Sequence, residues 1–405
     1  MTKITKYLNN GFCVGCGLCK SQFQDRIELQ IDNEGINKVN LSNIEDCDLK
    51  WFEKYCPAIN LYDLKDNMKN YSKIYGSYIS CYLGHSLDDN IRYQASTGGI
   101  VTSLMIYLLE KKYVEAIVHI GKNKSNPLET CVMVSTNSNE IKENICGSLY
   151  SSTTLLSNID NILKKYKKIA IVGKGCEIRA IDKIIKEKGY DHDNIYKIAI
   201  FCGGTPSRQA VKKICNDFEI NLKNILNIRY RGNGWPGYFV ITKKDMTQFR
   251  MNYRDSWVNY LSKEISLGCK ICFDGLANYS DISTGDAWYG AKKDGYPSFT
   301  EKEGRNLIFS RSLKGEELLQ HLSDDKFIKI TKVNVNEDIE LMQPSQDLRR
   351  KSAFYKIVAL RLLLYKYPKV NYKLLWDIRD KQSHIITKIK YILGTIRRVL
   401  YQTRR

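Results

Sequence analysis

The sequence predicts an α/β protein, α+β overall, with a core domain built on a parallel sheet and interrupted by a β-rich insertion. Two observations predict this class. Apolar strand-like runs alternate with helical patterns in the middle of the chain, and after residue 224 the pattern changes to short strands joined by turns. A cysteine-rich segment precedes the core and a basic helical segment follows it, so we divide the chain into residues 1–67, 68–345 and 346–405.

Composition excludes several classes of protein. The 405 residues are 43% apolar and 26% charged, as in ordinary globular proteins, which excludes global disorder. No run of about 18 uncharged apolar residues occurs, so no transmembrane helix is expected. The start, MTKITKYLNNGF, lacks the apolar stretch of a secretory signal, which favours a cytoplasmic location. The thirteen cysteines are therefore expected to be reduced thiols, some of them metal ligands.

The parallel part of the core is predicted from strand–turn–helix units. Residues 96–112 place apolar side chains on one helical face, with Ser96 or Thr97 as the cap. The apolar runs 167–173 and 196–202 each end in a glycine-containing turn followed by a helical pattern. Further strands are expected at 115–121, 131–136, 225–232, 237–244, 247–253, 281–290 and 305–312, with a short helix at 313–322.

The first cysteine constellation lies in the N-terminal segment. Cys13, Cys16 and Cys19 form a CxxCxxC run, and Cys56 stands before Pro57. Bacterial ferredoxins carry CxxCxxCxxxCP, in which the last cysteine ligates the other cluster. Phe23 takes the place of that last cysteine here, whereas the later segment keeps only its Cys-Pro, so one cluster is lost and the other stays complete. This predicts a ferredoxin-like segment with one 4Fe–4S cluster; a zinc site or incidental thiols are the alternatives, and Cys47 is a substitute ligand.

A second constellation is expected from the fold rather than from spacing. Cys269 and Cys272 form a lone CxxC. Cys176 and Cys202 follow two apolar runs, and neighbouring parallel strands would bring both to the carboxyl edge of one sheet, where doubly wound folds bind ligands. These cysteines form a second cage in one interpretation; in the other, Cys176 and Cys202 are buried core thiols.

An ordered series of motifs resembles one protein family over roughly residues 10 to 320. The chain is similar to the coenzyme F420 hydrogenase/dehydrogenase beta-subunit family, in its bacterial branch often associated with polysaccharide biosynthesis. The motifs are CVGCGLC, ASTGGIVTSLMIYLLE, GSLYSS, GKGCEIRAI, IFCGGTPS, IRYRGNGWPGY, LGCKICFDGLANYSDISTGDAW and EGRNLIFSRSLKG.

This resemblance implies an iron–sulfur flavoprotein that binds FAD. It also implies cysteine ligands at Cys176, Cys202, Cys269 and Cys272. The chain departs from the family in two places: the usual Gly-Thr-Pro-Cys loop is Gly-Lys-Gly-Cys at 173–176, and the two-cluster front end is reduced to one. Both departures bear on the substrate and on the electron path.

The flavin contacts are expected at two glycine-containing turns. Ser96, Thr97, Gly98 and Gly99 open a helix whose N-terminal N–H groups could bind a pyrophosphate; an N-cap with closely packed glycines is the alternative. The second turn contains Gly147, Ser148 and Tyr150.

Two aspartates follow the CxxC in sequence. Asp281 and Asp286 could bind the ribose or a ring nitrogen of FAD, or form turns. No residue is assigned as a catalytic acid or base.

The last segment holds most of the excess positive charge. Of a net charge of +19, residues 349–405 contribute +14, from sixteen Lys and Arg against two Asp. Apolar residues from Ile386 to Leu400 form a stripe with Lys and Arg around it. The tail either lies on an anionic membrane, at the inner face, or packs on the body with a solvated basic face. Nucleic-acid binding is the least favoured alternative, since no reading motif accompanies the charge.

The cofactors lead to a functional prediction. A flavin exchanges two electrons with an organic substrate and clusters carry one each, so the chain is expected to be an oxidoreductase, with a possible role in polysaccharide biosynthesis. Its electron donor would be ferredoxin, nicotinamide or deazaflavin. The alternatives are an electron-transfer subunit for a separate catalytic partner and a zinc-binding docking module.

Overall fold

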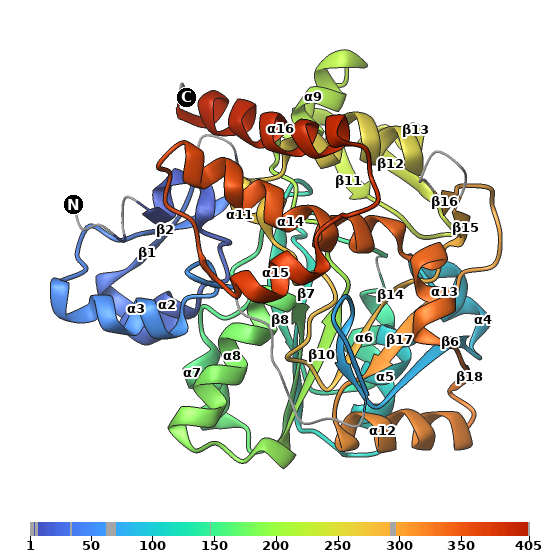
Figure 1. Cartoon of the computed structure of the whole chain (residues 1–405). Helices are drawn as coiled ribbons and strands as arrows, with labels where there is room; N and C mark the ends of the chain where they lie inside the picture. Colours follow the sequence, from blue (N-terminus) through green and yellow to red (C-terminus); the bar gives the residue numbers. More distant parts are fainter. Residues whose placement is uncertain are drawn as a thin grey trace.

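The computed structural model describes residues 4, 7–32, 35–61, 70–145, 147–291 and 297–403. It confirms the predicted mixed α/β fold (Figure 1). The core is an eight-stranded sheet with the strand order β18-β6-β17-β14-β10-β9-β7-β8.

Four central strands are parallel to one another. Their residues form nearly continuous apolar runs, as is typical of strands covered on both faces. Each begins and ends close to the range that the sequence predicts, apart from β14, which is shorter. They are β7 (Ala116–Lys122), β9 (Ile169–Lys174), β10 (Ile195–Ile200) and β14 (Ile282–Asp286).

The sheet is extended by antiparallel strands at both ends. Two of them, β8 (Thr130–Ser135) and β17 (Asn306–Ser310), were predicted from the sequence. The other two, β6 (Ser80–Ser86) and β18 (Ile328–Lys332), were not, because β18 is polar and largely exposed and β6 mixes buried and half-buried positions.

Helices cover both faces of the sheet. On one face, α5 (Ile100–Glu110) and α12 (Leu313–Asp324) pack on Ala170 and Val172 of β9. On the other face, α7 (Ile159–Lys165) and α8 (Gly175–Lys188) pack on the alternate residues Ile169 and Ile171. The side-chain period of two in β9 therefore divides the core into two halves, which gives the three-layer arrangement.

The β-rich insertion is a separate three-stranded antiparallel sheet. It contains β11 (Ile225–Arg229), β12 (Tyr238–Lys243) and β13 (Gln248–Asn252), and it packs with α9 (Gln209–Asp217) around a cluster of its own.

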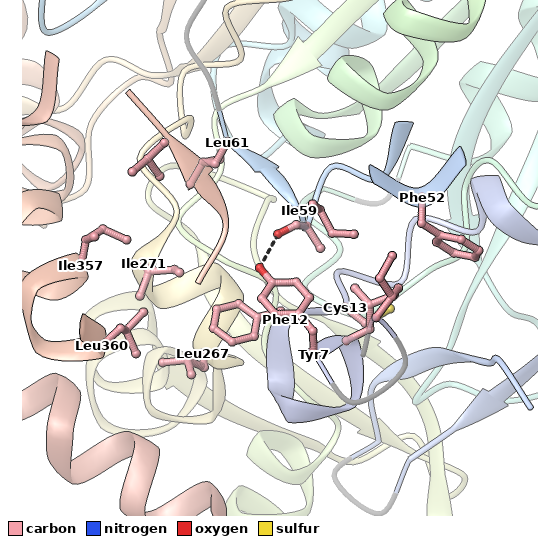
Figure 2. Close-up of a cluster of buried hydrophobic side chains, with 14 of the residues drawn as sticks. Tyr7, Phe12, Cys13, Phe52, Ile59, Leu61, Leu267, Ile271, Ile357 and Leu360 are labelled. Atoms are coloured by element: carbon pink, nitrogen blue, oxygen red, sulfur yellow. Dashed lines mark hydrogen bonds between the residues drawn. The ribbon is translucent and has the colours of Figure 1, made fainter. Parts of the chain in front are cut away.

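The N-terminal segment and the basic tail share one hydrophobic cluster, shown in Figure 2. Tyr7 and Phe12 stack in this cluster, and Leu267, Ile357 and Leu360 lie beside them. A two-residue parallel pairing of β3 (Asn60–Leu61) with β19 (Lys369–Val370) joins the two ends of the chain. The contributing α-helices are α2 (Leu18–Phe23), α3 (Leu49–Tyr55), α11 (Leu267–Ile271), α14 (Pro344–Leu362), α15 (Tyr372–Ile378) and, through Val399, α16 (Ile385–Thr403).

The two proposed segment boundaries fall in different settings. The one at 67/68 lies outside the described residues. The one at 345/346 falls in the first turn of α14, which begins at Pro344. Among the described residues, no helix is both long and apolar enough to cross a membrane.

Candidate metal centres and flavin region

Four cysteines of the N-terminal segment line one cavity. Cys13 follows a helical turn, Cys16 and Cys19 are at the start of α2 or just before it, and Cys56 directly follows α3. Residues far apart in sequence are thus brought together as the CxxCxxC motif and the remote Cys-Pro predict. We call this group the first cysteine cage.

The loop between these cysteines depends on two glycines. Gly15 and Gly17 both have a left-handed backbone, with φ of +66° and +82°. A Cβ atom on Gly15 would lie 2.3 Å from the carbonyl oxygen of Asn37. Glycine is therefore the residue that lets this loop turn through three cysteines against its neighbours.

Burial in the first cage disfavours the thiolate form of its four cysteines. Burial raises the pKa of Cys13, Cys16 and Cys19, and it raises the pKa of Cys56 to about 12, with the nearby Cys13 adding to this. Backbone N–H groups oppose the shift; those of Ala58 and Ile59, for example, face Cys56. A positively charged metal centre would offset the charge of four thiolates that this environment alone does not stabilise.

Cys47 does not join the first cage. Its side chain is exposed and its thiol faces the carboxylate of Glu45, 3.5 Å away. The substitute role considered from the sequence is therefore not favoured by its placement.

The second group of four cysteines lines another cavity. The parallel register of β9 and β10 brings their carboxyl ends together, which places Cys176, at the start of α8, near Cys202, just after β10. Cys269 lies in α11, and Cys272 directly follows it. We call this group the second cysteine cage.

Backbone and side-chain donors surround the second cage. The N–H group of Gly204 donates to the Sγ atom of Cys202 at 3.3 Å. Burial raises the pKa of Cys202 to about 11, an effect that Arg349 partly opposes. The Arg349 guanidinium donates to the carbonyl oxygens of Cys269 and Cys272, at 2.7 and 3.1 Å.

Two further cations line the same cavity. Lys174 pairs with Glu177 at 2.6 Å; burial alone would lower its pKa, but Glu177 and Cys176 raise it, so the charge is retained. Arg179 pairs with Asp274 at 2.5 Å and is buried. From the sequence, only Lys174 stood out, as part of the Gly-Lys-Gly-Cys loop. Arg179, one turn after Cys176 in α8, and Arg349, in the remote α14, lie in no local pattern that indicates a site.

The two cages are neighbours. Val14 and Pro57 line both cavities. Arg179 donates to the carbonyl oxygen of Pro57, next to Cys56, while pairing with Asp274, two residues after Cys272. One buried arginine therefore connects the walls of the two cages.

The spacing of the sulfur atoms distinguishes a single zinc ion from an iron–sulfur cluster. In a tetrahedral zinc site, with Zn–S bonds of about 2.3 Å, ligand sulfurs lie about 3.8 Å apart. In the described part of the chain, no three of the eight cage sulfurs lie within 4.8 Å of one another. The cages are thus wider than a single-ion site, and a larger iron–sulfur cluster fits them better.

The turn at 96–99 is anchored to the sheet by a residue that the sequence did not single out. The Asn306 side-chain oxygen accepts from the N–H groups of Gly98 and Ile100, at 2.7 and 3.4 Å. Its amide nitrogen donates to Thr97 and Thr284, at 2.9 and 3.0 Å. Asn306 therefore accepts from two of the N–H groups expected to face a phosphate. The run RNLIFSRS is predicted as a strand, and nothing in it indicates this role for Asn306.

Replacing Asn306 with alanine is expected to lower the free energy of unfolding by about 2–4 kcal/mol, since several buried polar groups lose their partner at once. Urea unfolding followed by circular dichroism would measure the change. Alanine at the exposed Asn161, which donates only to the neighbouring Asn158, should change stability by less than about 0.5 kcal/mol. Equal effects of the two substitutions would contradict the anchoring role.

The second predicted flavin turn lies beside the first. Ser148 donates to Ser96 through their hydroxyl groups, at 2.7 Å. Gly147 has φ of +70°, and a Cβ atom there would lie 2.1 Å from the carbonyl oxygen of Arg231. Tyr150 packs against Trp257, with ring centroids 5.0 Å apart.

Asp286 forms part of a buried aromatic and ionic group. It lies at the carboxyl end of β14, and both its oxygens accept from Arg231, at 2.8 and 2.9 Å. The Trp235 indole N–H donates to the same carboxylate at 2.9 Å, and Arg231 stacks on Tyr253. The arrangement orders this region of the protein and leaves the carboxylate with three protein donors.

Asp281 lies elsewhere. It precedes β14 at the opposite end of this strand, and its oxygens accept from the Lys197 N–H and the Ser312 hydroxyl, at 2.7 and 2.8 Å. The structure therefore brings Asp286 close to the predicted flavin turns but does not bring Asp281 there.

Comparison with known proteins identifies the family. The coenzyme F420 hydrogenase/dehydrogenase, beta subunit N-term, family matches residues 81–160, and the C-terminal family of the same subunit matches residues 166–336. The chain belongs to the coenzyme F420 hydrogenase/dehydrogenase beta-subunit family. The family predicted from the motifs is thereby confirmed. The family matches include the cysteines of the second cage and do not reach those of the first.

Several relatives are subunits of redox enzymes. The beta subunit of F420-dependent formate dehydrogenase from Methanocaldococcus jannaschii is 28% identical over 62% of this chain and 63% of its own length. The chain thus spans a little less than two thirds of that relative. The coenzyme F420 hydrogenase beta subunit from Methanococcus voltae is 26% identical over 70% of this chain and 92% of its own length.

A solved structure shares the fold. A chain of the F420-reducing NiFe hydrogenase complex from Methanosarcina barkeri matches with a TM-score of 0.56 and 20% identity, over 74% of this chain and 98% of its own length.

Proposed function

We propose that this chain is an iron–sulfur flavoprotein subunit that transfers electrons between a deazaflavin of the coenzyme F420 type and a partner redox protein. The observation that carries the proposal is the pair of adjacent cysteine cages, each lined by four cysteines and each wider than a zinc site. Family membership supports it, because the relatives named above are subunits of F420-dependent oxidoreductases.

Different residues would bind the clusters and compensate their charge. The cysteines of the first and second cages would each hold one 4Fe–4S cluster, and a bound cluster supplies one-electron transfer. Lys174, Arg179 and Arg349 offset the negative charge of thiolate ligands at the second cage. Val14 and Pro57 line both cavities and so form a wall that the two cages share.

FAD belongs to the same proposal. A deazaflavin exchanges two electrons at once, whereas a cluster carries one electron at a time. A bound flavin can do both, so it would supply the link between them. The turns at 96–99 and 147–150, which are joined by a hydrogen bond, would contact the flavin. Asp286, bound by the indole of Trp235, would help to fix the neighbouring part of the chain. A role in polysaccharide biosynthesis stays a prediction.

A second candidate is a reductase that acts on an organic substrate without a partner. The relatives named above favour the electron-transfer subunit, because both are beta subunits of larger redox enzymes. The two functions differ in one result: an isolated subunit is reduced by a donor but turns over no substrate alone.

Anaerobic purification tests the proposal. We expect a brown protein with about eight iron and eight sulfide per chain, one FAD, and bleaching on addition of reduced coenzyme F420. Serine at the exposed Cys47 should leave the iron content unchanged. A protein that contains zinc without iron or sulfide would contradict the proposal and favour the docking module. Clusters without any flavin would contradict its FAD component alone.

A further inference from the structure

The last helix of the chain, α16 (Ile385–Thr403), lies along the outer surface of the molecule next to α14 (Figure 1). Its inward face is mixed, with the half-buried Tyr391 and Ile392 beside polar residues. Thr395 and Val399 are buried there, and Arg398 donates to the carbonyl oxygen of Ile265 at 2.9 Å. The tail therefore packs on the body, but α16 does so with a face other than its apolar one.

The apolar stripe of α16 faces solvent. Four of the five residues of the predicted stripe, Ile386, Ile389, Leu393 and Leu400, and the adjoining Ile385 keep between 45% and 60% of their surface exposed, whereas Ile396 is half-buried. With 3.6 residues per turn, these positions span an arc of about 100°. An arc of this width is what a helix normally buries against a protein core, so α16 presents a core-like surface to its surroundings.

The charges on the helix indicate what covers the stripe. α16 contains four cations, at Lys388, Lys390, Arg397 and Arg398, and no acidic residue. Lys390 and Arg397 are exposed, and they flank the stripe on its outer side. Residues 349–405 together contribute +14 of the net charge. The partner of this surface is thus apolar along the stripe and negatively charged along the border where Lys390 and Arg397 lie.

We propose that α16 docks the protein on an anionic lipid bilayer, with the apolar stripe in the boundary between headgroups and acyl chains and the flanking cations at the headgroups. The helix is about 28 Å long and would lie in the plane of the surface. A protein interface fits less well, because interface cores are enriched in aromatic residues and the stripe consists of Ile and Leu alone. The inference is independent of the cofactors.

Vesicle flotation of the full chain tests this inference. Vesicles of phosphatidylcholine with phosphatidylglycerol should carry the protein, whereas vesicles of phosphatidylcholine alone should bind it at least about tenfold more weakly. Raising the salt concentration should weaken binding several-fold, because the exposed charges are screened.

Substitutions locate the binding surface. The double variant Ile389→Glu/Leu393→Glu, and separately Lys390→Glu/Arg397→Glu, should each weaken vesicle binding by about tenfold or more. These side chains point outward, so circular dichroism and thermal unfolding should remain as in the unmodified chain. The control Leu313→Glu, at a 72% exposed position on α12, should bind vesicles unchanged.

Three results would overturn the inference. The first is no flotation with anionic vesicles, and the second is equal binding to neutral and anionic vesicles. The third is self-association, seen by size-exclusion chromatography, that the Ile389→Glu/Leu393→Glu variant abolishes, since the stripe would then be an interface between copies.

Discussion

Serine at Cys16 is expected to halve the iron content of the protein, from about eight to about four iron per chain. Cys16 is buried in the first cage, so the variant removes one cluster ligand and leaves a small polar group in an apolar site. A cluster held by the first cage would connect Cys56 to the CxxCxxC loop, and we therefore expect the N-terminal segment to become susceptible to proteolysis as well. Iron and sulfide analysis, together with limited proteolysis under anaerobic conditions, would measure both effects.

The matching variant at the other cage separates the two clusters. Serine at Cys269 should also remove about half of the iron, but it should leave the N-terminal segment resistant to protease, because the first cage stays complete. The variant Cys47→Ser serves as the control with full iron content. Retention of all iron in Cys16→Ser would rule out the first cage as a cluster site, whichever result the second cage gives.

Methionine at Arg231 is expected to lower the free energy of unfolding by about 2–4 kcal/mol, because it leaves the half-buried carboxylate of Asp286 without its charged partner. Arg231 is fully buried and donates two hydrogen bonds to that carboxylate. It also stacks on Tyr253 and Trp288, so packing is lost with the charge. Denaturant unfolding of the cofactor-loaded protein would give the change.

A double-mutant cycle identifies the cause. If the cost comes from an uncompensated charge, Arg231→Met/Asp286→Leu should be more stable than Arg231→Met alone. As a surface comparison, Lys142→Met breaks the half-exposed pair with Glu110 and should cost less than about 1 kcal/mol. A double variant that is the sum of the two single ones would show that the pair itself contributes little. Loss of FAD from Asp286→Asn at unchanged stability would instead assign Asp286 to the flavin.

The elements of the core could be predicted because their patterns are local. The strands β9 and β10 are continuous apolar runs ended by glycine turns, and α5 and α8 show the period of a helix. The strands β6 and β18 escaped prediction for a related reason. Their place is decided by antiparallel pairing across more than 200 residues, and no pattern within either segment encodes such pairing.

The sequence predicted the cysteines of the candidate site but not the cations around them. Spacing and the carboxyl-edge argument together found all the cysteines of both cages. The cations Arg179 and Arg349 were not found. Arg179 lies one turn after Cys176 in α8, where no motif marks it, and Arg349 reaches the second cage from the distant helix α14. Asp281 and Asp286 looked equivalent in sequence. Asp281 precedes the five-residue strand β14 and Asp286 ends it, so the two lie at opposite ends of this strand.

The sequence by itself determined six of the eight strands of the core sheet, the helices α5, α8, α9 and α12, the spacing of the cysteines, the family, and the apolar stripe of the last helix. Only the tertiary structure decided that the two cages share walls, that Asp286 pairs with Arg231, and that the stripe of α16 faces outward. The physical reason is the range of the interactions. Periodicity and spacing act over a few residues, whereas cavities, buried ion pairs and exposed faces depend on which distant segments pack together.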